Sequence, residues 1–295
     1  MPDASMGHQS RLSFAATGTA IGSYTESIEF VGESLQKRLT ILETAGLRGT
    51  RSRPVERTRD GTCAVGGSIR FHVTPALLDL LLPRVLGAAE SSDLFALAET
   101  LPEFDVLVDR VARRFVYGGC KVARAIFSGR AGGLLELQLD LVGKTETVSA
   151  SAFPAISPPI DPPYVFQDGT LTLSGTSRKV LEFALSIDNG IVARFTNSQV
   201  ATDVSPTDRL VTLECRLPFT TDEIDLYGQN VGGAGAATLA VVNGGYSTTF
   251  SIPRLQFPDT SPMVGGKGEI TLALKGTARK NGSTNELSVT HDSTA

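Results

Sequence analysis

The sequence is poor in the residues on which most catalytic and metal sites depend. It has only three histidines, His8, His72 and His291, which lie far apart and form no motif. Metal sites and nucleophile–base pairs usually need histidine, so we expect no catalytic residue, metal site or cofactor. His72 alternates with apolar residues and is interpreted as a strand residue on a polar face. Tryptophan is absent and aromatic residues make up 6%, which weakens any interpretation as a sugar-binding module.

The cysteines are equally uninformative about chemistry. Cys63, Cys120 and Cys215 are an odd number at wide spacings, with no CxxC pair. Such spacing predicts neither a disulfide framework nor a zinc site. We therefore interpret all three as small apolar residues.

Long hydrophobic runs are missing as well. The longest, residues 76–86, is interrupted by Asp79, Pro83 and Arg84, whereas a transmembrane helix needs about 20 apolar residues. Residues 1–14 are polar and lack a basic segment leading into an apolar run, which argues against a secretory signal. The formal net charge of −4 has the wrong sign for gripping nucleic acid through its phosphates. We expect a protein without a membrane segment that is made in a cytoplasm.

Alternation of apolar and polar residues dominates both halves of the chain and predicts a mainly β protein. In residues 135–141 every second residue is leucine, as a half-buried antiparallel strand requires. Residues 68–73, 181–187, 211–217 and 270–274 alternate in the same way. Asp188-Asn189-Gly190 and Asn281-Gly282 are typical of tight turns, so we predict a hairpin at each.

Two helices are predicted. Thr74 and Pro75 are suited to the N-cap and the first turn of a helix that runs to Leu86, before Gly87. A shorter helix is expected from Thr221 to Gly228, with two acidic residues in its first turn. Both are interpreted as helices that pack onto a sheet.

A proline-rich segment, residues 153–163, reads as an extended linker because proline cannot donate ladder hydrogen bonds. We therefore predict one domain at 1–155 and another at 156–295. Each side has a strand and a helix (68–86 and 210–227), followed later by a strand bounded by glycines (133–143 and 266–276). This shared order indicates a weak internal duplication.

A cluster of arginines lies in a segment too polar for a core, which predicts a long exposed loop at about 45–65. Its members are Arg48, Arg51, Arg53, Arg57 and Arg59. The guanidinium groups could pair with carboxylates of a neighbouring subunit, since arginine gives directional pairing. The alternatives are a solvated loop and, less favoured, direct DNA binding.

Several segments, in this order, resemble the tail tube proteins of long-tailed phages, in the two-domain form of some non-contractile tails. They are residues 66–75, 117–122, 186–190, 243–250 and 262–270. The resemblance covers roughly Arg59 to Asp292. It implies two tandem β-sandwich or partly rolled barrel domains, each with a short flanking helix. Neighbouring subunits would join edge to edge into a ring, and long strands would line a lumen. The lumen candidates are Glu136, Gln138, Asp140, Glu269 and Thr271.

The resemblance also implies a function. The chain would be a structural protein of the virion that stacks into a tail tube and conducts double-stranded DNA. Its expected partners are further copies of itself, the tape measure protein, and the tail terminator and distal tail proteins. If the halves are duplicates, three chains would close a ring with pseudo-sixfold symmetry. The alternatives are a tail connector or distal ring of the same fold and, less favoured, a β protein that binds or cleaves glycans.

Overall fold

A computed structural model describes residues 5–224, 226, 234–258, 261–262 and 264–294. Within them one α-helix, α1 (Pro75–Leu86), accompanies a large antiparallel β-sheet system that does not close into a barrel. The mainly β fold predicted from the alternation is confirmed.

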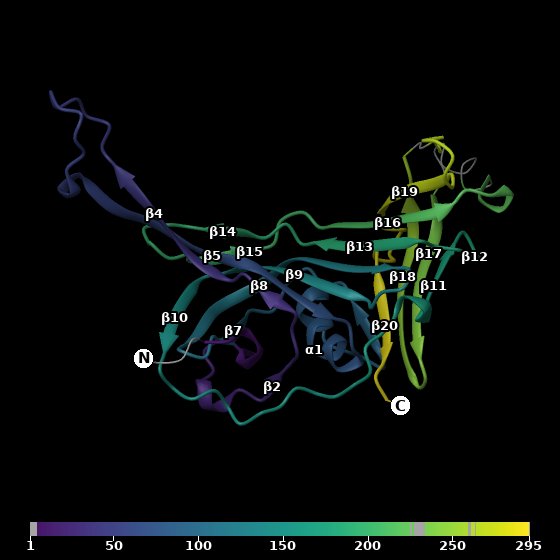
Figure 1. Cartoon of the computed structure of the whole chain (residues 1–295), viewed down its shortest axis with the longest axis horizontal. Helices are drawn as coiled ribbons and strands as arrows, with labels where there is room; N and C mark the ends of the chain where they lie inside the picture. The colour runs from purple at the N-terminus through teal and green to yellow at the C-terminus, as the bar shows by residue number, and fades with distance from the viewer. Residues whose placement is uncertain (1–4, 225, 227–233, 259–260, 263, 295) are drawn as a thin grey trace.

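A seven-strand main sheet runs through the middle of the molecule (Figure 1). Its strands, in spatial order, are β4 (Gln36–Glu43), β5 (Thr58–His72), β9 (Glu136–Gly143), β8 (Arg114–Arg130), β13 (Glu182–Asp188), β16 (Leu210–Pro218) and β19 (Thr271–Ala278). Short β3 (Gly32–Glu33) pairs with β5 beside β4. The β8–β13 pair joins strands from both predicted halves, so the halves share one sheet.

Two smaller groups of strands lie on either side of α1 (Figure 1). The first contains β1 (Arg11–Ala16), β2 (Glu26–Ser27), β7 (Phe104–Asp109) and β10 (Thr145–Ser149), together with the first part of β8. The second contains β6 (Leu94–Ala96), β11 (Gly169–Leu173), β12 (Thr176–Arg178), β17 (Ala234–Asn243), β18 (Tyr246–Gln256) and β20 (Ser288–Asp292). A separate hairpin pairs β14 (Val192–Arg194) with β15 (Asp203–Ser205).

The start of α1 is as predicted. Thr74 has an extended backbone, and its side chain accepts a hydrogen bond from the backbone N–H of Leu77. Gly87 ends the helix in the left-handed region, at φ 93°, where a side chain would be strained. The second predicted helix begins as a 3₁₀ turn, Thr221–Glu223, and its continuation to Gly228 falls largely outside the described residues.

Both predicted hairpins are wrong in their pairing. β13 ends at Asp188, but the chain then leaves the sheet for the β14–β15 hairpin, and β13 pairs with β16 instead. The Asn189 amide holds this exit in place by donating to the carbonyls of Val85 and Val122, both at 3.1 Å. After the turn at Gly282, β20 pairs with β18 and β6 rather than with β19.

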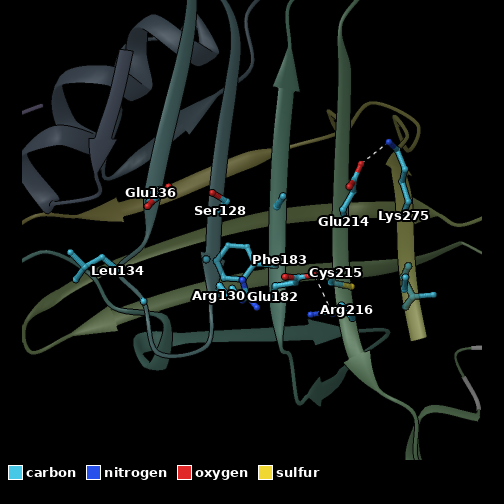
Figure 2. Close-up of a pocket in the computed structure, with 15 residues that line it drawn as sticks. Ser128, Arg130, Leu134, Glu136, Glu182, Phe183, Glu214, Cys215, Arg216 and Lys275 are labelled. Carbon is cyan, nitrogen blue, oxygen red and sulfur yellow. Dashed lines mark ion pairs between the residues drawn. The ribbon is translucent and has the colours of Figure 1, made fainter. Parts of the chain in front are cut away.

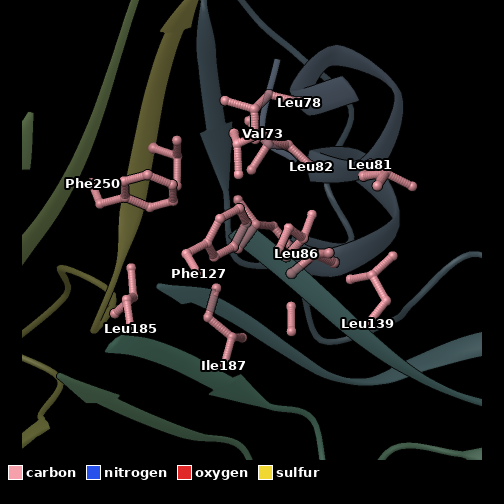
Figure 3. Packing of buried hydrophobic residues seen from close by; sticks show 14 of the residues in the cluster. Val73, Leu78, Leu81, Leu82, Leu86, Phe127, Leu139, Leu185, Ile187 and Phe250 are labelled. Atoms are coloured by element: carbon pink, nitrogen blue, oxygen red, sulfur yellow. The ribbon is translucent and has the colours of Figure 1, made fainter. Parts of the chain in front are cut away.

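One hydrophobic core joins the helix to both halves of the chain. Figure 3 shows Leu82 and Leu86 of α1 near Phe127 of β8, with Leu185 of β13 and Phe250 of β18 close by. Phe127 and Phe250 have ring centroids 4.9 Å apart. Burial of these side chains provides the main stabilisation.

The proline-rich segment, residues 153–163, contains no helix or strand, as predicted for a linker. It is nevertheless anchored at both ends. Phe153 is buried under the guanidinium of Arg11, 4.4 Å from its ring centroid. Asp161 accepts a hydrogen bond from the N–H of Ala76 in the first turn of α1. The domain boundary at 155/156 remains a prediction.

Candidate functional site: a charged sheet face and a projecting arm

The main sheet has one apolar and one polar face. In β9 the leucines are buried, whereas Glu136, Gln138 and Asp140 point to the opposite side and are at least partly exposed. β13, β16 and β19 alternate in the same way. The side that points away from the core is called the polar face.

Residues of the polar face stand opposite one another in rows across the strands. The first row is Ser68, Asp140, Arg124, Asp188 and Leu210. The second row is Arg70, Gln138, Ile126, Ser186, Thr212 and Thr277. The third row is His72, Glu136, Ser128, Ala184, Glu214 and Lys275. The fourth row is Arg130, Glu182, Arg216 and Ala273.

Opposite charges alternate along these rows. Arg124 stands between Asp140 and Asp188, and Glu182 stands between Arg130 and Arg216. Directly opposed side chains in an antiparallel pair have Cβ atoms about 5 Å apart, within reach of ion pairing.

Three ion pairs form on the polar face between residues that the structure describes. The guanidinium of Arg124 lies 3.0 Å from the carboxylate of Asp140. Arg216 Nε lies 3.1 Å from Glu182 Oε1, and Lys275 Nζ lies 2.6 Å from Glu214 Oε1. All six side chains keep a quarter or more of their surface exposed. Such pairs contribute little to stability, but they set the local charge.

A hollow of about 760 Å³ lies at one end of the polar face, over β8, β13, β16 and β19 (Figure 2). Its charged lining comprises Glu136, Glu182, Glu214, Arg130, Arg216 and Lys275. Carboxylates and cations are therefore balanced. Two of these carboxylates are engaged by the ion pairs drawn in Figure 2.

The predicted lumen residues fall mostly on this face. Glu136, Gln138 and Asp140 occupy successive rows, and Gln138 Nε2 donates to Asp140 at 2.9 Å. Thr271 begins β19, opposite Pro218. Glu269 is exposed in the loop before β19, so the strand predicted from Gly266 starts too early. Gly266 has φ 150° in that loop, a conformation that glycine tolerates.

The β14–β15 hairpin covers the opposite end of the polar face. Lys121 of β8 donates from Nζ to the carbonyl of Val204 at 2.7 Å and lies 3.6 Å from Glu103. The N–H of Cys63 donates to the carbonyl of Gln199 at 2.7 Å. The four rows described above therefore form the part of the polar face that the hairpin leaves uncovered.

An arm, residues 38–64, projects beyond this covered end (Figure 1). β5 continues seven residues past Val65, where its pairing with β9 stops, which corresponds to about 23 Å. β4 is exposed along its whole length. Large apolar side chains stand in solvent there, with Ile41 63%, Val55 75% and Leu47 103% exposed. Large exposed apolar patches are common at protein–protein interaction sites.

The five predicted arginines all lie on the arm. Arg48, Arg51 and Arg53 are in the loop 44–57, and Arg57 ends its 3₁₀ turn. Arg59 lies in β5 opposite Leu42, so the expectation of a loop through residue 65 is wrong. Residues 58–62 of β5 pair with exposed β4 and are not buried themselves, so no buried face imposes alternation there. Arg53 pairs with Glu43 at 2.9 Å.

The two outermost strands of the main sheet have open edges. β4 pairs only with β5 in the part of the chain that the structure describes. β19 pairs with β16 on one side, and on the other its pairing with β18 is limited, among the described residues, to Thr277 and Ala278. Open edges of this kind can accept a strand from another chain.

The histidines and cysteines do not gather into a site. His72 is exposed on the polar face, as predicted, opposite Glu136. His291 is buried, with Nδ1 2.8 Å from Thr248 Oγ1 and Nε2 3.1 Å from the carbonyl of Pro75. The three cysteines are free and buried, as expected of small apolar residues. Among the described residues no group of His, Cys, Asp and Glu is arranged to hold a metal ion, and no helix there could span a bilayer.

The chain is thus a mainly β protein whose main sheet has a charged polar face and whose arm projects into solvent. The family described as "Phage tail tube protein" matches residues 7–278. The chain therefore belongs to the phage tail tube protein family, a structural family of the virion tail, and the resemblance noted from the sequence is confirmed. Comparison with curated proteins finds no match.

Proposed function

We propose that the chain polymerises into stacked rings that form the tail tube and conduct double-stranded DNA into the host. The observation that carries the proposal is the main sheet, which has two different open edges, β4 and β19, and one continuous polar face. Pairing of unlike edges is a heterologous contact, and such contacts generate rings when the rotation closes. The polar face would then line the lumen.

Three chains would form each ring. The sequence indicates a weak internal duplication on the two sides of the linker. If each half supplies one domain, three chains provide the six domains that single-domain relatives would draw from six chains. Barrel circumference depends on strand number and spacing, which fusion of two domains does not alter. The ring would therefore have pseudo-sixfold symmetry.

The arm would join successive rings. It extends past one end of the main sheet, whereas the hollow of the polar face lies at the opposite end. Arginines and exposed apolar residues on the arm suit a contact with another copy of the chain. Arg48, Arg51, Arg53, Arg57 and Arg59 are thus proposed as ring-to-ring or subunit contacts.

In this role the protein would catalyse no reaction and need no cofactor. It would assemble in the cytoplasm of the host bacterium and remain in the virion tail. Beyond other copies of itself, its partners would be the tape measure protein and the terminator and distal proteins that complete the tail.

Negative-stain microscopy of the purified protein tests the proposal. Long tubes with a stain-filled centre are expected, since a tube protein must polymerise alone. Single rings that never stack would indicate a connector or distal ring protein. A protein that stays monomeric at high concentration but binds an oligosaccharide panel would contradict the proposal.

A further inference from the structure

The open part of the polar face carries many cations for a surface that DNA is proposed to pass. Arg70, Arg124, Arg130, Arg216 and Lys275 all point to it. A row of free arginines and lysines would bind phosphates, because each neutralised phosphate releases condensed counterions. Such a lumen would retain DNA rather than release it.

Carboxylates of the same face stand beside four of these five cations. Arg124, Arg216 and Lys275 each lie within 3.1 Å of a carboxylate, and Arg130 stands opposite Glu182. Arg70 is the exception, since its neighbour in the row is Gln138. A cation already paired with a carboxylate offers a phosphate no net charge.

We propose that Asp140, Glu182 and Glu214 keep the polar face from binding double-stranded DNA by neutralising Arg124, Arg216 and Lys275. This inference rests on the proposed function, because it assumes that DNA passes this face. In this role the carboxylates control what the polar face binds and are not needed for the stability of the fold. Exposed pairs of this kind contribute roughly 0 to 1 kcal/mol to stability, so the fold alone does not require them.

The arrangement differs from simple acidity. A uniformly acidic wall repels DNA over a Debye length of about 8 Å at physiological salt. The fields of alternating charges cancel over a shorter distance, so the face neither attracts nor repels DNA strongly.

The test converts the three carboxylates to amides and measures DNA binding. The variant Asp140→Asn, Glu182→Gln, Glu214→Gln frees three cations without changing side-chain shape. A matched control, Glu29→Gln, Asp93→Asn, Glu99→Gln, makes the same charge change at exposed positions outside the rows of this face. Binding of a fluorescent 20-base-pair duplex is followed by anisotropy across a range of salt concentrations, with circular dichroism melting as the check on folding.

We expect the wild-type protein and the control to bind the duplex weakly. The face variant should bind at least about tenfold more tightly at low salt, with an affinity that falls steeply as salt rises. Equal binding by the face variant and the control would overturn the inference. If the triple variant melts early, Glu214→Gln alone, which frees exposed Lys275, should still bind more tightly than Glu99→Gln.

The result is separable from the proposed function. Tube formation is read by microscopy, whereas DNA binding is read on the soluble chain. Tubes without a gain in DNA binding would remove this inference and leave the tube intact. A gain in DNA binding without tubes would support the role of the three carboxylates and remove the proposed tube function.

Discussion

Asp188, at the end of β13, is the cross-strand partner of Arg124 in β8, so the two halves of the chain meet within one sheet. On the other face of the same pair of strands, Leu185 stands opposite Phe127, and both side chains are buried. Seven consecutive residue pairs, from Glu182–Arg130 to Asp188–Arg124, form this seam. The structure therefore makes the stability of each half depend on the other.

Leu185→Ala tests this dependence. The side chain is fully buried in the core shared by α1 and both halves, so its truncation should cost about 2 to 5 kcal/mol of unfolding free energy. We expect urea unfolding to stay a single transition that shifts as a whole. The control Ala184→Ser, on the polar face, should change stability by less than about 0.5 kcal/mol. Separate transitions for the two halves would contradict the account.

Part of this arrangement could be predicted from the sequence. The alternating leucines identified β9 because this strand buries one face. The Thr74 cap identified the start of α1 because the first N–H groups of a helix need an acceptor. β7 was missed because it is buried on both faces and does not alternate, and β4 was missed because neither face is buried. The β8–β13 seam joins residues more than 50 positions apart, and no local pattern specifies such pairing.

The candidate site, too, could be predicted from the sequence only in part. The polar residues of β9 were identifiable, and so was the arginine cluster of the arm. The sequence did not reveal that Glu182 would stand between Arg130 and Arg216, because that row depends on the register of three strands.

Replacing Arg51, Arg53 and Arg57 with serine should impair assembly but not folding. These side chains are exposed, and exposed charges contribute little to intrachain stability, so the melting temperature of the monomer should barely change. Tubes should become fewer and more sensitive to salt, which turbidity and microscopy can measure. Arg113→Ser, Arg194→Ser, Arg279→Ser removes the same charge elsewhere. Unimpaired assembly of the arm variant would exclude the proposed contact.

Glu286 should make stability depend on acid pH. Burial raises its pKa, but the hydrogen bond of Arg209, 2.8 Å away, a backbone hydrogen bond and the charges of Arg209 and Lys280 together outweigh burial. They lower the pKa below its ordinary 4.5. A depressed pKa stabilises the fold above the ordinary value, and this contribution is lost as pH falls through the folded pKa.

Glu286→Gln should therefore destabilise the protein by about 1 to 3 kcal/mol at pH 7. The difference from wild type should shrink as pH falls below about 4.5. Urea melts at several pH values measure it, with Glu99→Gln as a control because Glu99 is 97% exposed and lies 3.8 Å from the same arginine. A difference that does not depend on pH would show that the ion pair is not its cause.

The cysteines should be unreactive in the folded chain. Burial raises the pKa of Cys215 to about 12. Burial also raises the pKa of Cys120, with the carboxylates of Asp105 and Glu103 adding to the effect. Because the thiolate is the reactive form, Ellman's reagent at pH 8 should label no cysteine before denaturation and all three afterwards. Rapid labelling of the native protein would place a cysteine on the surface.

Cryo-microscopy of assembled tubes, viewed down the axis, tests the central claim most directly. The account predicts stacked rings of three chains, with the polar face carrying Glu182 and Arg216 turned toward the lumen and the arm reaching the adjoining ring. Rings that do not stack, or a polar face turned to the outside of the tube, would contradict it.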